Sequence, residues 1–99
     1  MGRTPVTQPN DDPLIRQLRQ QISDTDRSIV EGINARLRLV TRIKAYKESR
    51  GLGFVDPERE EWMFRDLERA NRGPLSREGL REIFQAILDL TKREVEREK

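Results

Sequence analysis

Two cations and two branched apolar residues share one face of a long helix-forming segment, and together they could hold a small anion. Arg36, Val40, Ile43 and Lys47 follow i, i+4, i+7 and i+11 spacing, which places them on one face of an α-helix. The two cations then lie about 16 Å apart along the axis. A solvated face would not carry Val and Ile, and an ordinary core would not carry Arg and Lys. This face predicts an anion pocket, unless both cations simply extend to solvent from a half-exposed surface.

Two further arginines are candidates for the same site. Arg59 falls in the first turn of a second expected helix, where unpaired N–H groups and the helix dipole favour an anion. Alternatively, Arg59 is a surface residue that forms an ion pair with Glu58 or Glu60. Arg19 precedes Lys47 by 28 residues, about 42 Å along one helix, so the two cannot share a pocket within one chain. They could share one if an antiparallel partner chain brought its own N-terminal half alongside.

The acidic and aromatic residues nearby have simpler interpretations. Asp56 precedes Pro57 and is explained chiefly as a helix N-cap, whereas Glu60 is not required by local structure. The aromatic residues of the two later helices are expected to be core residues, since aromatic side chains are usually buried. These are Trp62, Phe64 and Phe84.

The composition excludes several classes of function. The 99 residues include no cysteine and no histidine, which excludes disulfides, thiolate nucleophiles, Ser-His-Asp triads and the usual zinc sites, and no metal or cofactor is expected. The 20 basic and 18 acidic residues are interspersed, so no basic face for nucleic acid is expected. No apolar run is long enough for a membrane span or a signal peptide. We therefore expect a soluble, cytoplasmic protein.

The periodicity predicts three helices, one long and two short. Residues 1–12 are polar and contain two prolines, so a disordered lead-in is expected before a helical domain over 13–99. The first helix begins after the cap Asp12, and the Gly51-Leu52-Gly53 segment ends it. The second starts after Asp56, and the third is capped by Ser76. Its last turns, over 92–99, are almost wholly charged and are expected to fray.

The length of the first helix predicts a second chain. About 36 helical residues span about 54 Å, whereas a domain of this size has a radius of gyration of about 13 Å. Apolar residues recur along the whole segment, and only 33% of the chain is hydrophobic. A small chain of this kind often gains burial by oligomerising. We therefore expect a homodimer formed through this helix.

The ordered set of charged positions resembles the all-helical class of chorismate mutases. It consists of Leu18-Arg19-x-x-Ile22-x-x-x-Asp26, then Arg36 and Lys47, then Asp56-Pro57-x-Arg59-Glu60. The resemblance covers residues 14 to about 93 and is closest to the short domains found alone or fused to enzymes of early aromatic biosynthesis. It implies an all-α, intertwined homodimer with two active sites that convert chorismate to prephenate, each borrowing one arginine from the partner chain.

The resemblance also implies a role for each residue. Arg19 would be the borrowed arginine, and Arg36 and Arg59 would bind the carboxylates of chorismate. Lys47 would contact the ether oxygen and a carboxylate. The ring hydroxyl would be held by Glu60 and by Asp56, the latter through its backbone. Thr91 stands where the family often has a serine near the ring carboxylate.

The sequence departs from the family pattern at one position. Four residues beyond Thr91 the family usually has Gln or Glu, which hydrogen-bonds the ether oxygen, but this chain has Val95 with Glu94 adjacent. Either Glu94 reaches in after a one-residue shift of the helix, or the ether oxygen relies on Lys47 alone, or the substrate differs.

Three other functions are therefore retained as alternatives. A same-fold enzyme could release pyruvate from isochorismate or rearrange an amino-substituted chorismate. A catalytically weak dimer could instead bind and regulate another enzyme of the aromatic pathway. A nucleic-acid-binding helical hairpin is favoured only by the arginine content, and it predicts a strongly salt-dependent affinity.

Overall fold

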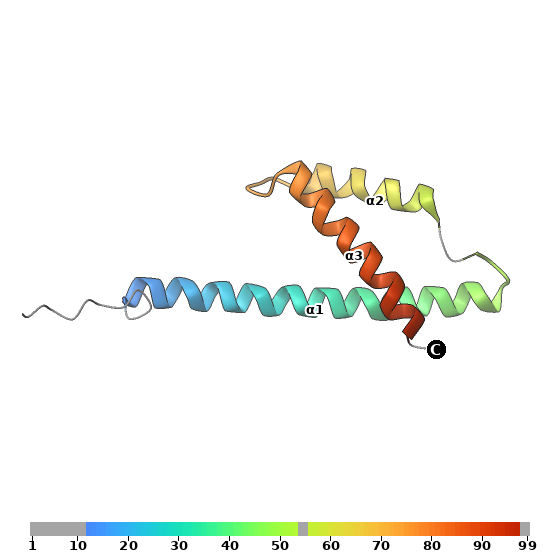
Figure 1. Cartoon of the computed structure of the whole chain (residues 1–99), viewed down its shortest axis with the longest axis horizontal. Coiled ribbons are helices and arrows are strands. Elements are labelled where there is room, and N and C mark those ends of the chain that lie inside the picture. The colour runs from blue at the N-terminus through green and yellow to red at the C-terminus, as the bar shows by residue number, and fades with distance from the viewer. Residues whose placement is uncertain (1–11, 54–55, 98–99) are drawn as a thin grey trace, which may run out of the picture. The chain divides into compact units, whose positions relative to one another are not determined.

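The chain folds into three α-helices. In the computed structural model, which describes residues 12–53 and 56–97, α1 spans Pro13–Ser49, α2 spans Pro57–Ala70 and α3 spans Arg77–Arg97 (Figure 1). No strand occurs in those residues. The expected all-α class, with one very long helix and two shorter ones, is confirmed. The lead-in predicted for 1–12 lies outside the described residues except for Asp12.

Each helix starts at the cap residue that the sequence predicts. A side-chain oxygen of Asp12, Asp56 and Ser76 accepts a hydrogen bond from a backbone N–H two or three residues further on, at 2.8, 3.1 and 2.9 Å respectively. Each such bond satisfies an N–H group that has no partner within the helix. Because proline follows both aspartates, the first turns of α1 and α2 are preset to helical geometry.

The C-terminal end of α1 is closed by a glycine in the left-handed conformation. Gly51 has φ of +70°, its N–H bonds to the Glu48 carbonyl at 3.2 Å, and the Leu52 N–H bonds to the Lys47 carbonyl at 2.8 Å. This pair of bonds is the Schellman arrangement, which satisfies carbonyls that the helix leaves without partners. The helix end is therefore fixed on the backbone of Lys47.

Two compact units make up the chain, residues Met1–Asn34 and Ala35–Lys99. In the first unit, the described part of α1 presents large apolar side chains that remain exposed. These are Leu14, Leu18, Ile22, Ile29 and Val30. No residue of α1 is buried.

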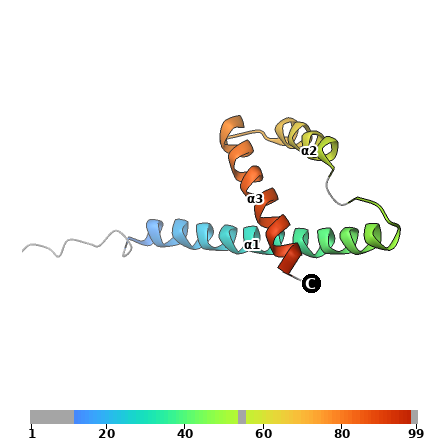
Figure 2. The ribbon, with the colours of Figure 1, turned by 45° about the vertical axis from the view of Figure 1, so that its right-hand side comes forward.

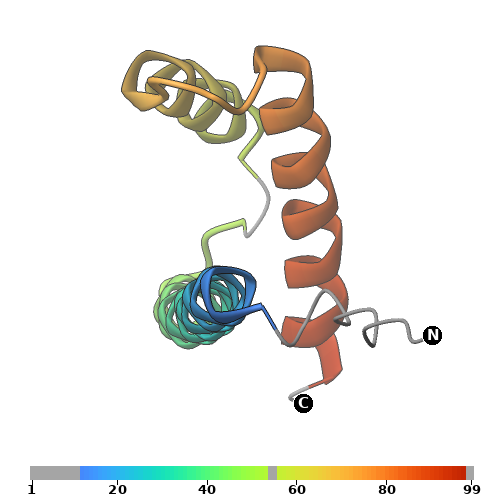
Figure 3. The same cartoon turned by 90° about the vertical axis from the view of Figure 1, so that its left-hand side faces the viewer.

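The core of the second unit lies between α2 and α3. Phe64, Leu80 and Leu88 are buried, and Met63, Leu67 and Phe84 pack against them. Figures 2 and 3 show a connecting segment that leads from the end of α2 to the start of α3, from which the two helices diverge. Phe64 and Phe84 therefore belong to the core, as predicted.

The prediction that Trp62 is a core residue is wrong. Trp62 is 49% exposed, whereas Phe64, two residues further along α2, is 7% exposed. Two helical residues differ by about 200° around the axis, so a helix that turns Phe64 toward α3 turns Trp62 away from it.

The predicted fraying of the last turns is also wrong over residues 92–97. The helix α3 continues to Arg97, and Val95 is only 2% exposed. Glu94 and Arg97 form an ion pair at 2.7 Å within this last part of the helix. A single buried valine and a local ion pair thus keep a highly charged segment helical, while residues 98–99 lie outside the described residues.

Candidate active site

A cleft of about 340 Å³ opens in the unit formed by residues 35–99, and all three helices contribute to it. Its lining consists of four cations, two carboxylates, three apolar residues and one hydroxyl. They are Arg36, Val40, Ile43, Lys47, Asp56, Arg59, Glu60, Leu88, Thr91 and Lys92. Four positive and two negative side chains leave a net charge of +2. A small dianion fits such a lining.

The α1 wall of this cleft is the stripe predicted from the sequence. Arg36, Val40, Ile43 and Lys47 all line the cleft. Arg36 and Lys47 are half-buried, so neither simply extends into solvent. Val40 and Ile43 supply the apolar part of this wall between the two cations.

Arg36 is held in place by groups from both other helices. Its Nη1 donates to Thr91 Oγ1 at 2.8 Å, and its Nη2 lies 3.8 Å from Met63 Sδ. Burial of the guanidinium lowers the pKa of Arg36, and the nearby positive charge of Arg59 lowers this pKa further. A bound carboxylate would oppose this lowering of the pKa, because its negative charge stabilises the protonated guanidinium.

The Thr91 hydroxyl is fully engaged within the protein as a donor. Its proton is directed to the Ile87 carbonyl at 2.6 Å, so it can only accept from Arg36. Thr91 is also buried. In this structure Thr91 orients the Arg36 guanidinium.

Arg59 is exposed and reaches the cleft from the first turn of α2. Its backbone N–H is the donor to the Asp56 cap, which fixes the start of the side chain. Its guanidinium lies over the Trp62 ring, 4.5 Å from the ring centroid. The alternative ion pair with Glu58 or Glu60 is absent from the described residues.

Glu60 is paired with a lysine that the sequence analysis missed. Glu60 Oε2 lies 3.4 Å from Lys92 Nζ, and both residues line the cleft. Lys92 lies in the segment that the sequence predicts to fray. Its position next to Thr91 and four residues after Leu88 is the signal that could have identified it, because this spacing keeps it near the same helix face.

A comparison with known proteins identifies the family. A sequence model described as chorismate mutase type II matches residues 18–96, most of the chain. The chain belongs to this family. It is 31% identical over 83 residues to the bifunctional chorismate mutase/prephenate dehydratase of Pseudomonas aeruginosa, an alignment that covers 79% of this chain and 23% of that protein. It is 30% identical over 79 residues to the protein of the same description from Stutzerimonas stutzeri, covering 75% of this chain and 22% of that protein.

This chorismate mutase domain therefore spans less than a quarter of the length of the curated relatives it matches. No solved structure matches the chain significantly. Among the described residues, no helix combines the length and the apolar character needed to cross a membrane.

Six of the seven site residues expected from the sequence line this one cleft. They are Arg36, Lys47, Asp56, Arg59, Glu60 and Thr91. The seventh, Arg19, is an exposed residue of α1 in the unit formed by residues 1–34 and is not part of the lining.

The position where chorismate mutases usually have Gln or Glu is apolar and closed to solvent in this chain. Val95 is 2% exposed, and it does not line the cleft. Glu94 does not take its place, because its carboxylate pairs with Arg97 at 2.7 Å and also lies outside the lining. Both residues belong to one continuous α-helix, Arg77–Arg97.

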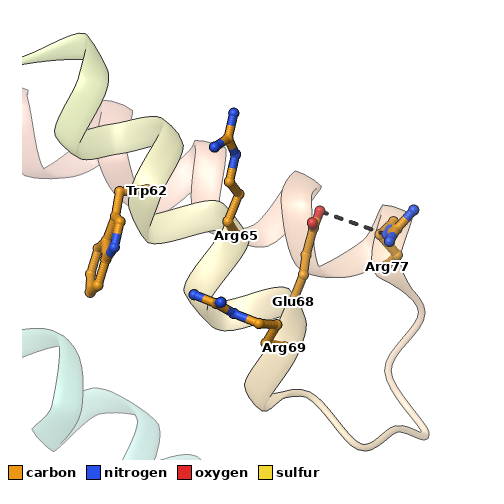
Figure 4. Close-up of a pocket in the computed structure, with 5 residues that line it drawn as sticks. All are labelled: Trp62, Arg65, Glu68, Arg69 and Arg77. Atoms are coloured by element: carbon orange, nitrogen blue, oxygen red, sulfur yellow. Dashed lines mark ion pairs between the residues drawn. The ribbon is translucent and has the colours of Figure 1, made fainter.

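A second, more open cleft of about 440 Å³ lies along the outer side of α2 (Figure 4). It is lined by Trp62, Arg65, Glu68, Arg69 and Arg77. Glu68 forms ion pairs with Arg77 at 3.9 Å and with Arg81 at 2.5 Å. Among the lining residues, Arg77 therefore joins α3 to α2 through Glu68.

Proposed function

We propose that this protein catalyses the rearrangement of chorismate to prephenate. The observation that carries the proposal is the cleft itself, in which three cations, Arg36, Lys47 and Arg59, surround an apolar wall in a chorismate mutase domain. Chorismate carries two carboxylates, which the net charge of the lining complements.

The proposed reaction makes few chemical demands on the side chains. In one concerted step the ether C–O bond breaks while a C–C bond forms between the enolpyruvyl arm and the ring. No nucleophile, proton transfer or metal takes part in this step. Catalysis then comes from holding the flexible arm over the ring, which clamping of both carboxylates would achieve.

Arg36 and Arg59 are the proposed carboxylate clamps. Arg36 is oriented by Thr91 and still has guanidinium N–H groups beyond the one that Thr91 uses, so it can donate to a carboxylate as well. Arg59 faces the same cleft from α2. Two clamps on different helices suit a substrate with two separate carboxylates.

Lys47 is the proposed electrostatic catalyst. Negative charge builds up on the ether oxygen as the C–O bond breaks, and a fixed cation beside it stabilises the transition state more than the ground state. In a site that excludes water such a donor contributes about 3–4 kcal/mol, a factor of roughly 10² to 10³ in rate. Since Val95 supplies no polar group, Lys47 carries this role without a second donor from position 95.

Glu60 and Asp56 are proposed to hold the ring hydroxyl. Glu60 presents its carboxylate to the cleft from α2. The Asp56 side chain is occupied by the N–H of Arg59, so its contact with substrate would be made through the backbone.

We also propose that the active form is a homodimer in which Arg19 completes the site of the partner chain. The exposed apolar residues of α1 between residues 14 and 30 support this proposal, since they have no cover within the described part of their own unit. Two antiparallel copies would bury these residues and give two equivalent sites.

The bifunctional relatives combine chorismate mutase with prephenate dehydratase in one protein. An enzyme of aromatic biosynthesis that consumes prephenate is therefore a reasonable partner for this chain. We propose the cytoplasm as the place of the reaction, and no nucleic acid as a partner.

The experiment that tests the proposed function is product identification with three substrates offered separately. The protein is incubated with chorismate, isochorismate or an amino-substituted chorismate, and the products are separated and identified by mass. We expect prephenate from chorismate as the main product. Release of pyruvate from isochorismate, with a higher kcat/KM than that for chorismate, would instead assign the lyase function. The departure from the family pattern at Val95 keeps this alternative open. Turnover that appears only with an added aromatic-pathway enzyme would assign a regulatory role.

A further inference from the structure

Trp62 occupies an unusual place for a tryptophan in so small a domain. It is 49% exposed and takes no part in the core formed by Phe64, Leu80 and Leu88. Its ring instead lies against the Arg59 guanidinium, one helical turn earlier on α2, with 4.5 Å between the guanidinium carbon and the ring centroid. Arg59 lines the candidate active site, whereas Trp62 lies outside it.

We propose that Trp62 is a positioning residue that holds the Arg59 guanidinium at the mouth of the active site through a cation–π contact. This inference rests on the proposed function, because it assigns to Arg59 the binding of a substrate carboxylate. Trp62 is not among the seven site residues that the family resemblance implies.

An uncharged partner such as the Trp62 ring suits Arg59 for a physical reason. Across residues 12–53 and 56–97, no carboxylate forms an ion pair with Arg59, and the adjacent Glu60 is engaged by Lys92 at 3.4 Å. A carboxylate partner would neutralise Arg59 and compete with the incoming anion. An aromatic face attracts the cation through its quadrupole and leaves the charge intact.

A guanidinium that turns one face to the ring, with its carbon over the ring as Arg59 has it, also keeps its donors available. The N–H groups of a guanidinium lie in its own plane, so a ring against one face leaves them free to meet a carboxylate at the edge. The stack therefore restricts the rotamers of an exposed side chain before substrate arrives. Less conformational entropy is then lost on binding.

The charge of Arg59, which Trp62 is proposed to position, also affects Arg36. The positive charge of Arg59 is one cause of the lowered pKa of Arg36, after burial. Arg59 is thus near enough to act on Arg36, and no ion pair of either guanidinium occurs among residues 12–53 and 56–97. Trp62 contributes to this arrangement from outside the cleft.

The kinetic test compares Trp62→Leu and Trp62→Phe with the wild type, using chorismate. Because a carboxylate clamp acts on the ground state and the transition state alike, loss of the stack should raise KM with little change in kcat. We expect KM to rise about two- to fivefold in Trp62→Leu, the range that an exposed cation–π contact gives, and less in Trp62→Phe, which keeps a smaller ring.

The chain offers a matched control. Tyr46 is also exposed, at 57%, and the guanidinium carbon of Arg50 lies over its ring, 5.0 Å from the centroid. Neither residue lines the cleft. Tyr46→Leu removes the same kind of contact and should leave KM unchanged. Because Trp62 is outside the core, thermal unfolding should show both leucine variants folded.

A spectroscopic measurement tests the stack without relying on turnover. Trp62 is the only tryptophan in the sequence, so its emission reports on its ring alone when tryptophan is excited selectively. Arg59→Ala should change the intensity or the wavelength of this emission. Unchanged emission would overturn the inference, since the guanidinium would then not lie against the ring in solution.

The combined outcomes separate this inference from the proposed function. An active wild type whose KM is unaffected by Trp62→Leu would overturn the positioning role and leave the mutase function standing. A folded wild type without turnover of chorismate would overturn the proposed function, and the role of Trp62 in substrate binding with it. A raised KM with kcat retained, together with altered emission in Arg59→Ala, supports the inference.

Discussion

Arg36 Nη1 and Thr91 Oγ1 lie 2.8 Å apart and join α1 to α3 across 55 positions of the chain. The threonine accepts this hydrogen bond while its own proton goes to the Ile87 carbonyl at 2.6 Å. The direction of the Arg36 guanidinium is therefore set by the backbone of α3. A clamp fixed in this way does not need to reorganise when an anion binds.

Removing the Thr91 hydroxyl should weaken this clamp. Thr91→Val keeps the shape of the side chain but supplies no acceptor, so Arg36 loses a hydrogen bond to a charged group, a loss of about 1.5–3 kcal/mol. We expect kcat/KM for chorismate to fall roughly tenfold or more. Thr91→Ser is the matched control and should stay close to the wild type. Equal kcat/KM in the valine and serine variants would show that Thr91 does not orient Arg36.

Restoring the usual family side chain at position 95 should not improve the proposed activity. Val95 is 2% exposed and does not line the cleft, so the amide in Val95→Gln would be buried without a partner. We expect a loss of about 1–3 kcal/mol in the free energy of unfolding and no increase in kcat. Chemical denaturation and chorismate kinetics on the same preparation give both values. An increased kcat would show that position 95 reaches the ether oxygen after all.

The contact between α2 and α3 should make stability depend on pH in the acid range. The hydrogen bond from Arg81 lowers the pKa of Glu68 below its ordinary value of 4.5, and the charges of Arg81 and Arg77 add to this. A carboxyl group with a lowered pKa in the folded state stabilises the protein above its unfolded pKa, and this contribution decreases as pH falls through the folded value.

Glu68→Gln should therefore lower Tm near neutral pH and lose less stability than the wild type on acidification. Thermal unfolding at several pH values, from neutral into the acid range, measures whether the Tm of Glu68→Gln approaches that of the wild type as pH falls. The exposed Glu82 provides a control. We expect the curve of Tm against pH for Glu82→Gln to run parallel to that of the wild type. Parallel curves for Glu68→Gln and the wild type would show that this ion pair does not link pH to folding.

The proposed sharing of sites between two chains can be tested by mixing two inactive variants. Arg19→Ala and Lys47→Ala should each abolish most turnover. A hybrid dimer that contains one chain of each would have one site with both residues intact, so random exchange should restore about a quarter of wild-type activity. Kinetics before and after unfolding and refolding of the mixture test this. A mixture that stays inactive although the chains exchange would contradict the shared site.

Local patterns were sufficient to predict the helices. The caps at Asp12, Asp56 and Ser76 and the glycine stop at Gly51 act through neighbouring residues, so the sequence predicts them well. The stripe from Arg36 to Lys47 is a periodicity within one helix, and it forms one wall of the cleft. On α2, the place of Arg59 in the first turn predicts an anion-binding role, whereas the roles of Asp56 and Glu60 toward substrate follow only from the family resemblance.

The parts that sequence analysis missed depend on contacts between helices. Whether Trp62 or Phe64 faces α3 is decided by packing, and both residues fit an apolar pattern equally well. Lys92 stands in a highly charged segment that stays helical with Val95 buried and Glu94 paired to Arg97, and this brings Lys92 to Glu60. The acceptor role of Thr91 likewise depends on which residue of α1 lies opposite.

The measurement that tests the central claim most directly is the turnover of chorismate by the wild type and by Lys47→Ala. Loss of the substrate's diene absorbance is followed continuously, and prephenate is identified in the product. We predict prephenate formation by the wild type and a kcat lower by a factor of about 10² to 10³ in a folded Lys47→Ala variant. A folded wild type that forms no prephenate, or a Lys47→Ala variant with wild-type kcat, would contradict the account.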